Sequence, residues 1–351
     1  LEKRGFELKS ETDSEALVHM ISIGIDSGQQ PLEAVRQTLN RATGTWGLCV
    51  LFKDHDLIVC ARNGSPLILG KGDGESFISS DPHALSQHTQ NFYFLEDGDM
   101  AIVTRDGIDI SRLEGGMSST SMTVIEDEWG EADMAGFPTF MLKEIHEQPE
   151  ALRRCITGRL DMANGSAKLG GLRLEPLRLR TTPQVRLIGC GTALNACKIG
   201  QLAIESLARI PAVAHVASEF RYNDPVINPN AIHFAVSQSG ETADTLSAVK
   251  EIRLKGGDVH GIVNVVGSTI ARLCGQGVYI HSGPEQAVAS TKAFTNMVAS
   301  LLLFAIRIGR TRSFSREKGQ SIIKDFEKIP EQMERYLANP GPIDEAVELV
   351  K

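Results

Sequence analysis

The residues with the clearest potential for chemistry are the serines and the threonine of the segment Ser237-Gln-Ser-Gly-Glu-Thr242. An apolar run at residues 231–236 precedes the segment and a helical pattern at 243–254 follows it, which predicts a strand, a turn and a helix start. Such a turn directs backbone N–H groups and three hydroxyls to one place, where the helix dipole also favours negative charge. The turn contains no lysine, which the P-loop of nucleotide-binding proteins requires. The segment therefore predicts a site for the phosphate of a sugar phosphate rather than for a nucleoside triphosphate.

A purely structural role for these hydroxyls is the alternative. Serine and threonine are frequent N-cap residues, so Ser239 or Thr242 would simply cap the following helix. One cap needs one hydroxyl, whereas this turn holds three hydroxyls and the amide of Gln238 within six residues. That surplus favours binding over capping.

Two more turns with hydroxyl side chains lie next to predicted helices. Thr192 follows an apolar run at residues 185–189, and Ser290 precedes an apolar helix predicted at 296–308. Ligands of open α/β sheets bind outside the carboxyl ends of the strands. We therefore expect the three turns to line one pocket.

The first of these turns also invites a dinucleotide interpretation through Gly189-Cys-Gly191. The third glycine of the G-x-G-x-x-G motif would fall at Leu194, and no ribose-binding acid follows at the usual distance of roughly 20 residues. A nicotinamide-dependent oxidoreductase is therefore disfavoured. Cys190 is expected to serve packing rather than nucleophilic catalysis.

The first part of the chain, residues 1–116, alternates short β-like stretches with polar turns. Helices are predicted at residues 14–25 and 31–40, and strands at 47–52, 57–61, 66–69 and 100–103. This mixture predicts a layered α+β domain. A turn-rich segment and a run of acids at 126–133 indicate a linker over residues 117–139.

From about residue 140, helical patterns alternate with apolar runs. The runs lie at residues 185–189, 212–216, 232–236, 259–265 and 277–280. Alternation of this kind predicts an α/β domain whose parallel sheet is covered by helices on both faces.

Composition narrows the class of protein. With 351 residues, 42% hydrophobic and 23% charged, the chain has the make-up of a globular protein of two domains. A net charge of −8 argues against nucleic acid as a partner, and the longest apolar run, 297–306, is too short to span a bilayer. The six cysteines and nine histidines show no metal-site spacing, so neither a metal nor another cofactor is expected and the cysteines are predicted to be reduced.

Several segments carry a resemblance to a known family. They are Cys190-Gly-Thr192, Ala217-Ser-Glu-Phe-Arg-Tyr222, Ser237-Gln-Ser-Gly-Glu-Thr-Ala-Asp-Thr245 and Val288-Ala-Ser-Thr-Lys-Ala-Phe-Thr295. In residue identity, order and spacing they resemble the first sugar-isomerase (SIS) domain of the glutamine–fructose-6-phosphate aminotransferases (isomerising), also called glucosamine-6-phosphate synthases. Phe140-Met-Leu-Lys-Glu-Ile-His-Glu-Gln-Pro149 resembles the helix that opens the isomerase part. Ser10-Glu-Thr-Asp-Ser-Glu15 and Ala61-Arg-Asn-Gly-Ser-Pro66 resemble the later half of the glutaminase domain.

The resemblance implies a domain plan. Residues 1–116 would be the C-terminal half of a type 2 glutamine amidotransferase domain with the layered N-terminal-nucleophile fold, and residues 140–312 the first SIS domain. Residues 313–351 would hold connecting helices and the truncated start of a second SIS domain. We expect the chain to be an internal fragment, with the nucleophilic cysteine and most acid/base residues outside it. No catalytic residue is therefore expected within it, and the fragment alone is expected to be inactive.

The activity that the resemblance implies is the conversion of fructose 6-phosphate and glutamine to glucosamine 6-phosphate and glutamate, a step of amino-sugar biosynthesis. It further implies a cytoplasmic homodimer joined through SIS domains, with no nucleic acid or membrane as partner. A non-catalytic sugar-phosphate-binding module derived from the enzyme is the alternative.

Site residues follow from the same resemblance. Ser237, Gln238, Ser239 and Thr242 would bind the phosphate, and Thr192, Ser290 and the backbone at Val288 would bind the sugar. Ala193 stands where members of the family often carry serine, so one hydrogen bond of the pocket would be absent or made through water.

In the first domain, Asp13 would bind the α-ammonium of glutamine, with helix N-capping as its alternative role. Glu219 and Arg221 are expected in a structural ion pair or subunit contact. Lys292 is expected to be a solvated or interface lysine rather than a Schiff-base residue.

Overall fold

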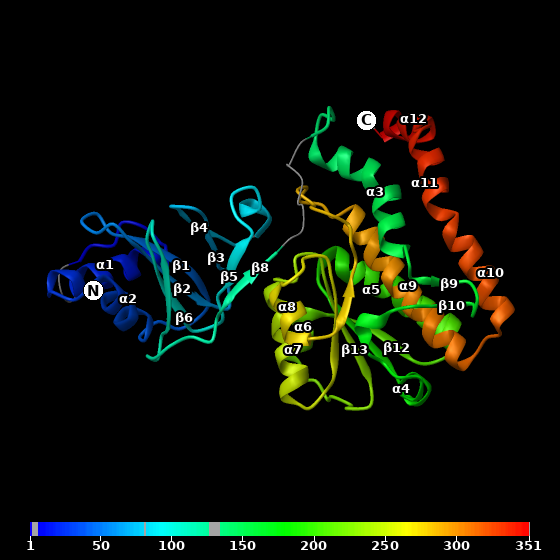
Figure 1. The fold of residues 1–351 in the computed structure, drawn as a ribbon, viewed down its shortest axis with the longest axis horizontal. Helices are drawn as coiled ribbons and strands as arrows, with labels where there is room; N and C mark the ends of the chain where they lie inside the picture. Colours follow the sequence, from blue (N-terminus) through cyan, green and yellow to red (C-terminus); the bar gives the residue numbers. More distant parts are fainter. Residues whose placement is uncertain (2–5, 81, 126–133, 351) are drawn as a thin grey trace. The chain divides into compact units, whose positions relative to one another are not determined.

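The chain packs into two compact units, residues 1–129 and 130–351 (Figure 1). The computed structural model describes residues 1, 6–80, 82–125 and 134–350. The predicted acidic run at 126–133 lies outside the described residues.

The N-terminal unit combines two helices with two antiparallel sheets of four strands each. Its helices are α1 (Asp13–Asp26) and α2 (Pro31–Leu39), with a 3-10 turn, η2 (Pro82–Leu85). One sheet has the order β1 (Trp46–Leu51), β2 (Ile58–Asn63), β6 (Asp99–Val103) and β7 (Ile108–Arg112). The other has the order β4 (Ser76–Ser79), β3 (Ile68–Lys71), β5 (Asn91–Phe94) and β8 (Met122–Val124).

The helices and sheets of this unit form layers. Helices α1 and α2 pack on one face of the β1-β2-β6-β7 sheet, where Val35 and Leu39 join a cluster with Val59. The opposite face meets the second sheet, because Cys60 clusters with Leu69 of β3. The prediction of a layered α+β domain is thus confirmed for the arrangement of its elements. Residues 122–124, predicted as linker, instead form β8, which pairs with β5.

The C-terminal unit is built on a parallel sheet of five strands, in the order β12-β11-β13-β14-β15. The strands are β11 (Val185–Gly189), β12 (Ala212–Val216), β13 (Ile232–Ser237), β14 (Val259–Val263) and β15 (Gly277–Tyr279). Each of the five predicted apolar runs coincides with one of them to within two residues. β13 is buried along its whole length, as expected for a central strand between two helical layers.

Helices cover both faces of this sheet (Figure 1). One face carries α3 (Phe140–Ile156), α5 (Gly191–Ala208) and α9 (Lys292–Arg312), and the other carries α6 (Ala217–Tyr222), α7 (Ala243–Leu254) and α8 (Thr269–Cys274). α9 is long and apolar enough to cross a membrane by length and composition, yet 72% of its apolar window is buried in the protein. It is the central core helix of the unit, packed against α5 and α3.

Smaller elements complete the unit. They are β9 (Leu160–Asp161), β10 (Ser166–Ala167), η3 (Gly170–Leu172), α4 (Pro176–Thr181), α10 (Arg316–Glu327), α11 (Ile329–Leu337) and α12 (Gly341–Val350). The helical character predicted for the end of the chain is therefore confirmed, and α11 packs against α3.

Candidate functional site

The hydroxyl-rich segment forms a tight turn between β13 and α7. β13 ends at Ser237, which is only 2% exposed, and α7 begins at Ala243. Gly240 has a φ of +66°, and a Cβ atom at this position would overlap the hydroxyl of Ser268. Only glycine fits this combination of left-handed backbone and close approach. The turn is consequently wedged against the loop that follows β14.

Each hydroxyl of the turn takes part in a hydrogen bond within the turn. The Oγ of Ser237 accepts the N–H of Gly240 at 3.0 Å and lies 2.9 Å from the Oγ1 of Thr242. The Oγ of Ser239 accepts the N–H of Glu241 at 3.1 Å. Thr242 occupies the N-cap position of α7, but its side chain makes no capping bond. The alternative that Thr242 serves as a side-chain cap is therefore wrong, and the helix entrance keeps its partial positive charge.

The acid within the turn is directed to a different helix. The Oε1 of Glu241 accepts the N–H of Thr269 at 2.7 Å, at the start of α8. The carbonyl oxygen of Gly240 accepts the N–H of Ile270 at 3.0 Å in the same helix. These bonds fix the turn to α8 and direct one oxygen of the Glu241 carboxylate away from the entrance of α7.

The entrance of α9 has the opposite arrangement, because the carboxylate of Glu285 occupies it. Glu285 accepts the N–H of Thr291 at 2.8 Å and the N–H of Ala293 at 3.1 Å. The hydroxyl of Ser290 donates to the same carboxylate at 2.9 Å. The negative charge therefore already satisfies the dipole of α9 and holds the predicted sugar ligand Ser290 in place.

Two residues that were not predicted as site residues, Asn264 and Glu144, support the loop between β15 and α9. Asn264 follows β14 directly; its Oδ1 accepts the N–H of Ser282 at 2.9 Å and its Nδ2 donates to the carbonyl of Gly283 at 2.8 Å. Its own N–H donates to the carbonyl of Gln238 at 3.1 Å, so it links the loop to the hydroxyl turn. Its place at the carboxyl end of a strand was the signal that could have identified it.

Glu144 supports the same loop from α3. This glutamate is 2% exposed and accepts the N–H of Gln286 at 2.5 Å and the N–H of Ala287 at 3.2 Å. Lys292 is also buried, with a side chain 5% exposed, and pairs with Glu147 of α3 at 2.5 Å. Of the two roles expected for Lys292, the solvated one is therefore wrong, because the side chain is buried against Glu147 of α3, and the interface role stays a prediction.

The remaining sugar-site candidates lie on connections that follow the carboxyl ends of the parallel strands. Thr192 is exposed near the start of α5, directly after β11, and β11 neighbours β13 in the sheet. Val288 is fully exposed in the loop before α9. The hydroxyls of Ser237 and Thr242 are thus in contact, and Thr192 lies on the connection after the neighbouring strand β11. Ser290 lies on the connection between β15 and α9. No bond joins Thr192 to Ser237, Ser239 or Thr242 among the described residues.

Asp13 lies in the N-terminal unit as the exposed first residue of α1. Thr12, not Asp13, holds the N-cap position, so the capping alternative for Asp13 is wrong. Glu15, in the same turn, accepts the N–H groups of Lys9 at 2.8 Å and of Ser10 at 2.7 Å. These bonds, with the Ser10 hydroxyl, lower the pKa of Glu15 to about 2 and hold the chain before α1 against the helix.

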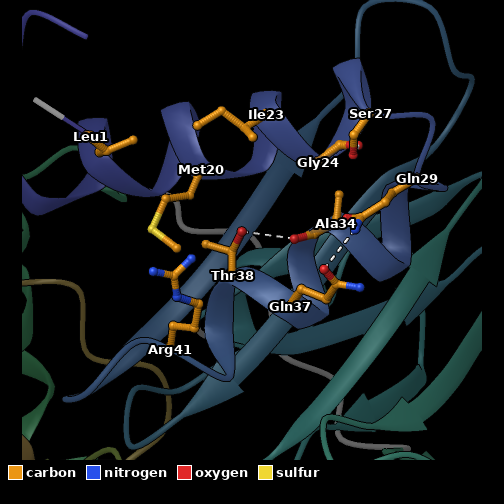
Figure 2. A pocket seen from close by; sticks show the side chains of 10 residues that line it. All are labelled: Leu1, Met20, Ile23, Gly24, Ser27, Gln29, Ala34, Gln37, Thr38 and Arg41. Atoms are coloured by element: carbon orange, nitrogen blue, oxygen red, sulfur yellow. Dashed lines mark hydrogen bonds between the residues drawn. The ribbon is translucent and has the colours of Figure 1, made fainter. Parts of the chain in front are cut away.

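The N-terminal unit also holds a cavity of about 250 Å³ between α1 and α2 (Figure 2). Met20, Gln37 and Arg41 line it, and the Nε2 of Gln29 donates to the Oε1 of Gln37 at 2.7 Å. None of its lining residues was predicted as a site residue. Among the described residues, no group of His, Cys, Asp and Glu side chains is arranged to hold a metal ion.

Comparison with known proteins connects this geometry to a family. The model of the SIS domain matches residues 178–307, the region that contains the sheet and the hydroxyl turn. A solved structure, the C-terminal domain of glucosamine-fructose-6-phosphate aminotransferase from Francisella tularensis, matches 62% of this chain and 61% of its own with a TM-score of 0.58 and 31% identity. The C-terminal unit therefore contains a SIS domain.

Curated relatives extend the similarity to nearly the whole chain. The glutamine–fructose-6-phosphate aminotransferase (isomerising) of Chlorobaculum tepidum is 41% identical over 344 residues, which are 97% of this chain and 56% of that protein. The protein of the same name from Symbiobacterium thermophilum is 38% identical over 99% of this chain and 57% of its own. Over nearly its whole length, the chain is similar to the glutamine–fructose-6-phosphate aminotransferases. It spans slightly more than half the length of these relatives.

Proposed function

We propose that the C-terminal unit binds the phosphate of fructose 6-phosphate at the turn between β13 and α7. The observation that carries this proposal is the hydrogen-bonded pair of Ser237 and Thr242, with Ser239 in the same turn, at a helix entrance without a side-chain cap. Hydroxyl groups and the first N–H groups of a helix are suitable donors to a dianion. Because the turn holds no cation, the phosphate is held without full neutralisation and the product can leave.

The two helix entrances also suggest how the ligand is oriented. The Glu285 carboxylate at α9 repels an anion, so the phosphate belongs at α7 and the sugar end extends toward α9. There the Ser290 hydroxyl and the backbone at Val288 are the proposed sugar contacts, with Thr192 on the neighbouring connection. Gln238 adds an amide to the phosphate side.

For the N-terminal unit, we propose the later half of a type 2 glutamine amidotransferase domain. The layered α+β arrangement is compatible with that fold, and the exposed carboxylate of Asp13 suits the α-ammonium of glutamine. The complete enzyme would be a cytoplasmic homodimer that converts fructose 6-phosphate and glutamine to glucosamine 6-phosphate and glutamate. We place no catalytic residue in this chain and expect the chain alone to release no glutamate from glutamine.

Isothermal titration calorimetry on the purified chain tests the phosphate assignment. Fructose 6-phosphate and glucose 6-phosphate are expected to bind, whereas fructose, which shares the sugar but lacks the phosphate, is expected to give no heat. Equal binding of fructose and fructose 6-phosphate would overturn the assignment. A glutamate-release assay against a heat-denatured control tests the expected inactivity, and release above that control would overturn it.

A further inference from the structure

Two cysteines of the N-terminal unit face each other across neighbouring antiparallel strands. Cys49 of β1 and Cys60 of β2 are direct partners in the strand register, and their sulfur atoms lie 3.8 Å apart. β1 is the edge strand of the described sheet, so Cys49 is exposed while Cys60 is buried between the two sheets. The proposed binding of sugar phosphate uses neither residue.

The backbone already has the spacing of a disulfide. Directly opposed residues in antiparallel strands have Cα atoms about 4.5–5.5 Å apart. Disulfide-bonded cysteines have Cα separations of about 4.4–6.8 Å. Closing the two sulfur atoms to a bond of about 2.05 Å therefore requires side-chain rotation and no movement of the strands.

The two thiols differ in reactivity in a complementary way. The Cys60 thiol donates a hydrogen bond to the Cys49 sulfur, which lowers the pKa of Cys49 and raises that of Cys60. An exposed thiol with a lowered pKa is the one that attacks, and a second thiol beside it resolves the product. Cys49 has both the access and the electrostatic support for the first step.

The other cysteines lack this combination. Burial raises the pKa of Cys155 and of Cys197, and it raises the pKa of Cys274 to about 12. Of the six cysteines, all of which are described, only Cys49 and Cys60 lie within bonding range of each other's sulfur. Cys274 therefore serves as an internal control.

We propose that Cys49 and Cys60 form a thiol modification site that a low-molecular-weight disulfide converts to an intrachain disulfide. The Cys49 thiolate attacks one sulfur of the reagent, the reagent's S–S bond breaks, and one thiolate leaves. The Cys60 sulfur then loses its proton and attacks the Cys49 sulfur, which expels the second thiolate. Two cysteines are oxidised by two electrons in total, the reagent is reduced to two thiols, and the two cysteine protons end on those thiols.

The Cys49–Cys60 disulfide would cross-link β1 to β2 on the sheet face opposite α1 and α2. Cys60 belongs to the cluster between the sheets, whereas Val59 next to it faces the helices. Oxidation is therefore expected to stabilise the N-terminal unit against unfolding without altering the sugar-phosphate site of the C-terminal unit. A closed loop restricts the unfolded chain, which is the usual source of such stabilisation.

The experiment treats the purified chain with oxidised glutathione and follows thiol content, mass and thermal unfolding. In the wild type, we expect two of the six thiols to disappear, the mass of two hydrogens to be lost, and one cross-linked peptide to join residues 49 and 60. Cys60→Ser should stop at one glutathione bound to Cys49, and Cys49→Ser should remain unmodified. Cys274→Ser should form the same cross-link as the wild type.

Each readout decides the proposal. A midpoint of thermal unfolding that rises by several degrees on oxidation, in the wild type and in Cys274→Ser only, agrees with it. Retention of all six thiols by the wild type in excess reagent would overturn it, as would a cross-link between any other pair. Because mass and cross-link are measured on the wild type, these outcomes do not depend on the folding of a variant.

Discussion

The entrances of α7 and α9 contain the same residue types and arrange them in opposite ways. Both combine serine, threonine and a nearby glutamate at the start of a helix. At α9, Glu285 accepts bonds from the helix it precedes, whereas at α7, Glu241 accepts a bond from the first turn of α8 instead. The direction of one carboxylate thus separates an entrance that is already satisfied from one that can receive an anion.

On the proposed assignment of the phosphate to α7, the difference lowers the stability of the α7 entrance and favours binding there. A carboxylate at a helix start stabilises the helix through the dipole and the first N–H groups, and the same charge repels a phosphate. The α7 entrance forgoes that stabilisation, since Thr242 makes no capping bond. Substitutions at the two entrances should therefore separate binding from stability.

The largest effect is expected from Gly240→Ala. The added Cβ would overlap the Ser268 hydroxyl at a φ of +66°, so the turn must shift and its hydroxyls lose their arrangement. Binding of fructose 6-phosphate should fall below detection by calorimetry, and stability should fall by about 1–3 kcal/mol.

Gly256→Ala is the matched control for this change. Gly256 follows α7 with a φ of +76° and has open space at its Cβ position. Gly256→Ala introduces the backbone strain without the steric overlap. The free energy of unfolding should therefore fall, while the affinity for fructose 6-phosphate should not change. Equal loss of binding in both variants would show that strain, not the wedged turn, controls the site.

The next effect is expected from the double substitution Ser239→Ala with Thr242→Ala. Each hydrogen bond to a charged group contributes about 1.5–3 kcal/mol, so binding should weaken by roughly two to four orders of magnitude if the effects add. Stability should fall less than binding, because the bonds lost from the free protein are those of Ser239 to the Glu241 N–H and of Thr242 to Ser237, and no helix cap is lost. Calorimetry and thermal unfolding on the same protein samples measure both quantities.

Ser315→Ala gives the opposite pattern and serves as the control. The Ser315 side chain caps α10 by accepting the N–H of Lys318 at 3.3 Å. Its loss should cost about 1 kcal/mol of stability and leave binding unchanged. Unchanged affinity in the double variant would instead mark the hydroxyl turn as purely structural.

A smaller effect on affinity is expected from Glu285→Gln. The change keeps the shape but removes the charge that satisfies the α9 entrance, so stability should fall by about 1–2 kcal/mol. Affinity for fructose 6-phosphate should fall less than tenfold, because only the placement of Ser290 is disturbed. An affinity loss as large as that of the double variant would contradict the assignment of the phosphate to α7.

The smallest effect is expected from Thr192→Ala. This exposed hydroxyl would contribute one hydrogen bond to the sugar, about 0.5–1.5 kcal/mol, so affinity should fall roughly two- to tenfold with no change in unfolding. Asn195→Ala, exposed on the same helix, is the control and should bind as the wild type does. Identical affinities for both variants would remove Thr192 from the site.

Local pattern was sufficient to predict the framework of the C-terminal unit. The apolar runs predicted all five parallel strands, and the hydroxyl turn falls between β13 and α7 as expected. These features depend on neighbouring residues and on periodicity, which the sequence displays directly. The glycine at 240 likewise stands where the left-handed turn requires it.

Contacts between residues far apart in the chain decided the environment of individual side chains, which the local sequence pattern could not predict. Glu144 meets Gln286 across 142 residues, and Lys292 is buried because Glu147 and α3 cover it. The alternative prediction that Asp13 caps α1 is wrong because the helix begins one residue earlier than that role requires, so Thr12 holds the N-cap position.

The sequence by itself determined the five parallel strands of the C-terminal unit, the turn after β13 and the kinds of group that this turn presents. The tertiary structure alone decided where the carboxylates of Glu241 and Glu285 lie and that Cys49 and Cys60 face each other. The physical reason is that side-chain direction at a loop and register between strands depend on packing partners distant in the chain. The type of a residue limits the hydrogen bonds that its side chain can make, and the fold determines which of these bonds form.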